Sequence, residues 1–203
     1  MKKEDRTDLV TLDMNQPIWE HFYTVAPLVV IGTKEGEGYD LAPKHMAMPL
    51  GRENYYGFIC LPAHSTWHNV KKEKAFTVSF PRPEQVTLTS LTASPRCGEA
   101  TNAKPALQGL PTFPAFQVDA LFLKDAYLYL ECELDRIIEG FGAFSLISGR
   151  IIGAYVQADS LKVADADAGA MIHQAPLLTY LAYGRFAEIK DSFAFPFPKD
   201  FHE

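Results

Sequence analysis

The chain has 203 residues, a length that corresponds to one large domain or two small ones. Apolar residues make up 47% of it and charged residues 22%, which excludes disordered and collagen-like chains. The net charge of −6 argues against a nucleic-acid partner, because affinity for a phosphate backbone depends on clustered Lys and Arg.

Short apolar runs separated by turn residues predict mostly strands in the first 80 residues. We expect a strand over residues 27–33, a turn containing two glycines, and a return strand over residues 39–48. A third strand is expected over residues 55–61. A short helix over residues 64–74 and a strand over residues 75–80 should follow.

The second half continues the same pattern and has no internal repeat or linker. The chain is therefore expected to form one domain over residues 1–203, with a core at about 26–186 and an aromatic, Pro-rich tail. The six or seven strands and few short helices predict a mainly β, barrel-dominated fold. The expected elements are a helix at 84–93, a long loop at 97–116, strands at 117–122, 126–138 and 144–157, and a helix at 175–183.

No run reaches the roughly 18 apolar residues of a membrane-spanning helix. The charged first ten residues do not resemble a secretory signal, so we expect a cytoplasmic protein without membrane partners. Three cysteines at wide spacing form no metal-binding pattern. Cys60 and Cys132 lie in apolar runs typical of buried thiols, whereas Cys97 is the one expected to be exposed.

The first candidate site lies where a predicted strand ends and the helix at 64–74 begins. The first turn of a helix presents unpaired N–H groups and a positive partial charge. The hydroxyls of Ser65 and Thr66 add further donors, so a phosphate group would fit beside His64. Ordinary N-capping explains the same residues without any ligand.

The second candidate is the return strand of the first hairpin. Pro43 and Pro49 cannot donate to a sheet, so the strand should be irregular or lie at an edge. Lys44, His45 and Met46 would then present backbone groups and a cation to a ligand. A solvated edge strand protected by Lys44 is the alternative.

The histidines give a weaker signal. His64 and His68 are four residues apart on the predicted helix, a spacing that can chelate a metal. No carboxylate base accompanies them as in HExxH, so no metal site is expected. The chain also lacks the GxSxG, P-loop and GxGxxG motifs, which disfavours hydrolases with a nucleophile elbow, nucleotide triphosphatases and Rossmann dehydrogenases.

The order of the segments resembles the flavin reductase-like family of FMN-binding split barrels. The resemblance starts in PLVVIGTKEGEGYDLAPKHMAMPL and YYGFICLPAHSTWHNVKKEKAFTVSFP. It continues through an Asn-Lys segment at 101–104 with Leu107 to Leu110, a Leu-Glu-Cys strand at 126–132 and a Pro-Leu…Gly-Arg-Phe segment at 176–186. The match covers about residues 26–186, which is most of the chain.

This resemblance implies a six-stranded Greek-key split β-barrel, usually a homodimer with FMN near the interface. The segment at 64–66 falls on the family's phosphate-contacting loop, and Asn69 lies one turn into the helix. The segment at 43–46 falls on the motif whose backbone lines the isoalloxazine ring. The implied cofactor-binding residues are Pro43, Lys44, His45, Met46, His64, Ser65, Thr66 and Asn69.

The expected activity is that of an FMN-dependent oxidoreductase, which transfers hydride or electrons through the ring. Lys44 is the expected stabiliser of the reduced flavin, with His45 second, and no catalytic residue is assigned. The partner is a small-molecule substrate or a flavin, with NADH or NADPH as one candidate donor. The alternatives are a flavin-binding or electron-carrier module without catalysis, a pyridoxamine-phosphate-oxidase-like enzyme, and a dimeric interaction protein without flavin.

The aromatic residues of the tail and of residues 110–116 are more numerous than in ordinary exposed loops. Two arrangements explain them. Either these segments wrap around the barrel, or they contact a partner subunit.

Overall fold

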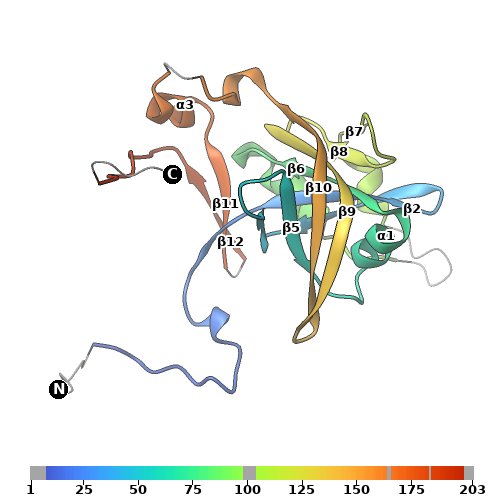
Figure 1. The fold of residues 1–203 in the computed structure, drawn as a ribbon, viewed down its shortest axis with the longest axis horizontal. Coiled ribbons are helices and arrows are strands. Elements are labelled where there is room, and N and C mark those ends of the chain that lie inside the picture. Colours follow the sequence, from blue (N-terminus) through green and yellow to red (C-terminus); the bar gives the residue numbers. More distant parts are fainter. Residues whose placement is uncertain (1–7, 98–103, 164–165, 183, 199–203) are drawn as a thin grey trace.

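The computed structural model describes residues 8–97, 104–163, 166–182 and 184–198. Its main feature is an antiparallel sheet with the strand order β3-β2-β6-β9-β10-β5-β4, curled into a barrel (Figure 1). Six of its strands have at least six residues, which confirms the six-stranded split barrel expected from the resemblance. The strands are β2 (Val29–Glu35), β3 (Gly38–Lys44), β4 (Ala47–Pro49), β5 (Tyr55–Cys60), β6 (Ala75–Phe80), β9 (Leu128–Phe141) and β10 (Phe144–Val156).

The two edge strands of the sheet, β3 and β4, follow each other directly in the chain, and this connection closes the barrel. β3 pairs with β2 at one edge of the sheet, and β4 pairs with β5 at the other edge. Only His45 and Met46 separate β3 from β4, and the carbonyl of Met46 accepts a hydrogen bond from the N–H of Ile59 at 2.8 Å. We call residues 44–47 the closing segment. This is the irregular strand that the two prolines predict.

A second, smaller sheet lies beside the barrel (Figure 1) and contains β1 (Val25–Pro27), β11 (Leu177–Leu181) and β12 (Arg185–Ile189) in the order β1-β11-β12. The expected helix at 175–183 is wrong, because the run Leu-Leu-Thr-Tyr-Leu pairs with β1 instead. A helix does occur just before it, α3 (Ala168–Gln174), where the Asp167 carboxylate accepts from the N–H groups of Gly169 and Ala170.

The remaining elements are short. The expected helix at 84–93 forms as η2 (Pro83–Gln85) followed by α2 (Val86–Leu91). The described part of the expected loop contains η3 (Pro105–Gly109) and β7 (Thr112–Pro114), and the strand expected at 117–122 is confined to β8 (Leu121–Leu123). The other elements are η1 (Ile18–Glu20), α1 (Ser65–Glu73) and η4 (Ala158–Ser160).

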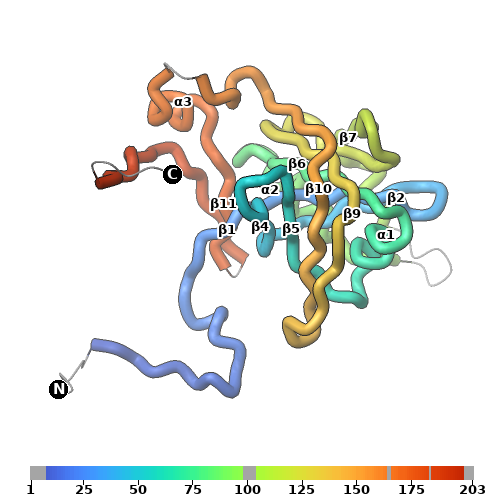
Figure 2. The backbone as a smooth tube through the Cα atoms, in the orientation of Figure 1, coloured from blue at the N-terminus to red at the C-terminus, as the bar shows by residue number. Residues whose placement is uncertain are grey.

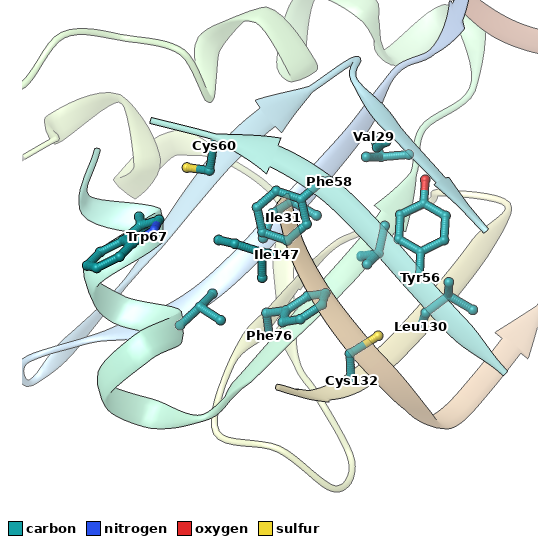
Figure 3. Packing of buried hydrophobic residues seen from close by; sticks show 13 residues of the cluster. Val29, Ile31, Tyr56, Phe58, Cys60, Trp67, Phe76, Leu130, Cys132 and Ile147 are labelled. Atoms are coloured by element: carbon teal, nitrogen blue, oxygen red, sulfur yellow. The ribbon is translucent and has the colours of Figure 1, made fainter. Parts of the chain in front are cut away.

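The main core fills the barrel and extends to α1 (Figure 3). Phe58 and Phe76 meet edge to face with ring centroids 5.3 Å apart, and Ile147 packs in the same cluster. On α1, Trp67 and Val70 are three residues apart and both buried, so one face of the helix packs on the barrel. That packing fixes where the N-terminus of α1 lies.

Several apolar side chains near the two ends of the chain remain exposed. The segment before β1 and the segment after β12 both extend away from the barrel (Figure 2). By contrast, Leu110 is buried and Phe113 packs against Phe122, so residues 110–116 cover their own barrel. No helix among the described residues is long and apolar enough to cross a membrane.

Candidate functional site

Two adjacent cavities open at the barrel beside the closing segment. The polar cavity, of about 340 Å³, lies between β3 and the start of α1. The apolar cavity, of about 500 Å³, lies between the barrel, α2 and the small sheet. Pro43 and Ala93 line both cavities, so the two are direct neighbours. Both volumes are in the range of about 300–1,000 Å³ typical of small-molecule sites.

The start of α1 forms one wall of the polar cavity. Its N-cap residue, His64, makes no side-chain hydrogen bond to the first turn. The N–H groups of Trp67 and His68 donate to the His64 carbonyl, so those of Ser65 and Thr66 remain for a ligand, at the positive end of the helix dipole. Ser65 and Thr66 line the cavity at this point. The structure thus has the anion-binding geometry expected for this segment.

A buried carboxylate holds two cations at the opposite wall. Asp40 is only 2% exposed. It pairs with Lys104 at 3.1 Å and with Arg96 at 3.2 Å. Arg96 also forms a two-nitrogen contact with Glu35, at 2.9 Å for each bond. Two cations are thereby fixed at the cavity wall, each already partly neutralised.

Lys44 is the remaining cation of the polar cavity and has no carboxylate partner among the described residues. Burial, the charge of Lys44 and that of Lys104 lower the pKa of His64. Burial and Lys44 likewise lower the pKa of His45. Both imidazoles are therefore neutral near pH 7, and the uncompensated positive charge of the polar cavity belongs to Lys44.

Cys60 lies close to this site but does not have the properties of a nucleophile. Burial raises the pKa of its thiol, and the nearby Lys44 ammonium only partly opposes this. The thiol is therefore protonated near pH 7 and forms part of the core.

The apolar cavity is bounded by the barrel on one side and by the small sheet on the other. Leu28 and Val86 contribute aliphatic surface, and Phe186 contributes an aromatic ring. The ring of Tyr180 stacks on His45 with a centroid distance of 4.5 Å and an interplanar angle of 29°. This stack links the closing segment to β11 and forms a flat aromatic wall.

The structure brings most of the predicted site residues together. Pro43, Lys44, His64, Ser65 and Thr66 line the polar cavity, and His45 and Pro43 line the apolar cavity.

Two predicted residues lie outside both cavities. Met46 is 45% exposed. Asn69 donates hydrogen bonds to Thr33 Oγ1 at 3.0 Å and to Glu35 Oε1 at 3.4 Å, so its amide supports the carboxylate that holds Arg96.

Sequence reasoning did not assign four of the residues that face the site. Lys104 lies in the Asn-Lys segment that resembles the family. That resemblance is the one feature of the sequence that could have assigned Lys104 to the site. Arg96 and Asp40 are 56 positions apart in sequence and meet only through folding. Tyr180 was assigned to a helix, which would have hidden the wall that it forms as part of β11.

The arrangement suits a ligand with a phosphate group and a planar ring. A helix N-terminus, hydroxyls and cations meet in one cavity, and a flat aromatic and aliphatic surface adjoins it. Among the described residues, no group of three or more His, Cys, Asp or Glu side chains could hold a metal ion.

Comparison with solved structures shows the same fold in other proteins. Flavoredoxin from Methanosarcina acetivorans is 17% identical, with 94% of this chain and 96% of that chain covered and a TM-score of 0.73. The 2-nitrobenzoate 2-nitroreductase of Pseudomonas fluorescens is 15% identical, with 100% and 99% covered and a TM-score of 0.75. An FMN-binding protein from Thermus thermophilus is 18% identical, with 93% and 100% covered and a TM-score of 0.74.

No curated protein matches the sequence significantly. A family model described as the flavin reductase like domain matches residues 22–184, well over half of the chain. The similar structures include a protein with a split barrel domain from Shewanella frigidimarina. By this match, the chain belongs to the flavin reductase like family.

Proposed function

We propose that this chain is a flavin reductase-like oxidoreductase that binds FMN as a single split-barrel domain. The observation that supports this most directly is the polar cavity, where the uncapped start of α1 faces Lys44. Residues 43–46, where this cavity meets the apolar one, offer a surface along which a planar ring can lie. When bound, FMN supplies hydride or electron transfer through its isoalloxazine ring.

The residues divide this work between the two ends of the cofactor. The N–H groups and hydroxyls of Ser65 and Thr66 would hold the phosphate, with Lys104 and Arg96 adding positive charge. Residues 43–46 would lie along the ring. Lys44, unpaired with any carboxylate among the described residues, would stabilise negative charge on the reduced ring, with neutral His45 beside it.

The visible spectrum of the purified protein, with added FMN and after desalting, tests cofactor binding. We expect the S65A/T66A double variant to bind FMN about tenfold or more weakly, because hydrogen bonds to a charged group are lost. The T112A variant, which alters a part-buried threonine of β7 outside both cavities, should bind like the wild type. A wild-type protein that takes up no FMN would contradict the proposal.

A second measurement separates the enzyme from an electron-carrier module. The enzyme should oxidise NADH or NADPH with excess free FMN, whereas a carrier should hold FMN without this turnover. The similarity of the fold to flavoredoxin keeps the carrier as the alternative to be tested.

We infer further that two copies associate with the cofactor near their interface, and that the protein works in the cytoplasm. Exposed aromatic side chains at both ends of the described chain support the association. Cys60 and Cys132 are buried free thiols, which is consistent with a reducing compartment.

A further inference from the structure

The apolar cavity has an uneven distribution of charge. Arg185 is the one fully charged side chain among the described residues that line it, and no Asp or Glu is among them. His45, the other ionisable base of the cavity, is held neutral by burial and by Lys44. A ligand of this cavity would therefore meet an apolar surface with a single positive charge.

Arg185 has no partner for that charge in the described part of the chain. No hydrogen bond or ion pair links it to another described residue. Glu188, the acidic residue of the same strand, pairs with Lys190 at 3.1 Å. The Arg185 guanidinium is exposed at the start of β12 and is available for a bidentate contact with a carboxylate.

Two hydroxyl groups of the cavity wall are also incompletely bonded. The hydroxyl of Tyr180 accepts a hydrogen bond from the Gly184 N–H at 2.7 Å, and its own proton has no acceptor among the described residues. Thr89 is fully buried, and the described chain offers its Oγ1 no partner. A buried polar atom rarely lacks a hydrogen-bond partner in the protein unless water or a ligand provides one.

We propose that the apolar cavity is a subsite for a small planar aromatic carboxylate, with Arg185 as the partner of the carboxylate group. The aromatic body would lie against the Tyr180–His45 stack and Phe186. This inference deepens the proposed function, on which it rests: it names a substrate class for the cavity beside the flavin. The flavin ring would lie along residues 43–46, where the two cavities meet, so the part of the apolar cavity beside Arg185 and Phe186 would remain for this ligand.

The experiment compares benzoate with benzamide, a neutral molecule of nearly the same shape. Saturation-transfer NMR measures the binding of each to the FMN-loaded protein and to the FMN-free protein. We expect benzoate to bind more tightly than benzamide. The R185Q variant should weaken benzoate binding about tenfold or more, without changing benzamide binding. Substitution R185K should restore part of the affinity, since it keeps the charge but loses the bidentate contact.

R150Q is the matched control, because Arg150 is an exposed arginine of β10 that pairs with Glu133 and lines neither cavity. It should bind benzoate like the wild type. FMN content, read from visible absorbance, reports the proposed function separately and should not change in R185Q. The subsite is refuted if benzoate and benzamide bind alike, or if R185Q binds benzoate normally. It is also refuted if benzoate displaces FMN, because the ring itself would then occupy this cavity.

Discussion

At the scale of single residues, Glu131 shows how a buried charge is accommodated in this barrel. Its side chain is completely buried. The carboxylate accepts hydrogen bonds from the N–H groups of Phe116, Gln117 and Val118 at 3.2, 2.7 and 2.9 Å. Three backbone donors aimed at one carboxylate replace its hydration and fix the loop between β7 and β8.

We expect the E131Q variant to lose about 3 kcal/mol of unfolding free energy, because an amide nitrogen would face backbone donors in a buried position. Urea denaturation measures this loss. The control is E133Q on the same strand, where the exposed Glu133 pairs with Arg150 at 2.6 Å. Breaking that surface pair should cost less than about 1 kcal/mol. Equal losses in the two variants would contradict this account.

At the scale of elements, the β2–β3 hairpin depends on close contact with the segment that contains β8. A Cβ atom on Gly32 would collide with the carbonyl oxygen of Leu121 and would lie 2.5 Å from Thr77 Oγ1. The Thr77 hydroxyl in turn donates to that same Leu121 carbonyl at 2.6 Å. Gly32 thus lets β8 lie against β2 and β6.

We expect the G32A variant to lose about 2 kcal/mol or more of unfolding free energy, because a backbone carbonyl cannot move aside as a flexible side chain can. The control within the same hairpin is G38A, whose added Cβ would meet only Glu35 O, at 3.8 Å. Thermal denaturation of both variants tests the difference. If G32A were as stable as G38A, the close approach of β8 would not be required.

The elements also show which parts of the fold the sequence could predict. Alternating and β-branched runs identified most of the barrel strands, because such runs encode their own local geometry. The segment at 175–183 failed because a short apolar run fits either a strand or a helix. Its partner β1 lies about 150 positions away in sequence, so the pairing is a tertiary effect.

In the candidate site, too, some residues could be predicted from the sequence and others could not. Ser65 and Thr66 were predictable because a strand end, a hydroxyl pair and a helix start follow one another in sequence. The Asp40–Lys104 pair and the approach of Arg185 to the apolar cavity were not, since each joins segments that meet only in the folded chain. Contacts across such separations leave no periodic signal.

At the scale of the whole molecule, the C-terminal segment exposes a row of aromatic side chains. Phe193, Phe195 and Phe197 are 94%, 72% and 50% exposed. The segment extends away from the barrel, as does the chain before β1 (Figure 2). Of the two arrangements that the sequence left open for these aromatics, contact with a second copy of the chain is the one that would bury the tail.

We expect light scattering coupled to size-exclusion chromatography to give the mass of a dimer. Replacing the three tail phenylalanines with serine should raise the dimer dissociation constant about tenfold or more, because apolar burial would be lost. The control is D191S, which introduces serine at an exposed polar position just before the phenylalanines. This variant should remain dimeric. A monomeric wild type, or a triple variant with unchanged mass at dilution, would exclude the tail as the contact.

The closing segment has a consequence for the stability of the fold. Two of the residues that join the two sheet edges also line the cavities, Lys44 the polar one and His45 the apolar one. A ligand that binds the native chain adds its binding free energy to the stability of the fold. In this protein the ligand would bind at the point where the barrel closes. There, a two-residue bend joins β3 to β4, without a continuous ladder of hydrogen bonds between the two strands. Binding of a cofactor there would therefore hold this joint closed, and the cofactor-free protein would open at it more readily.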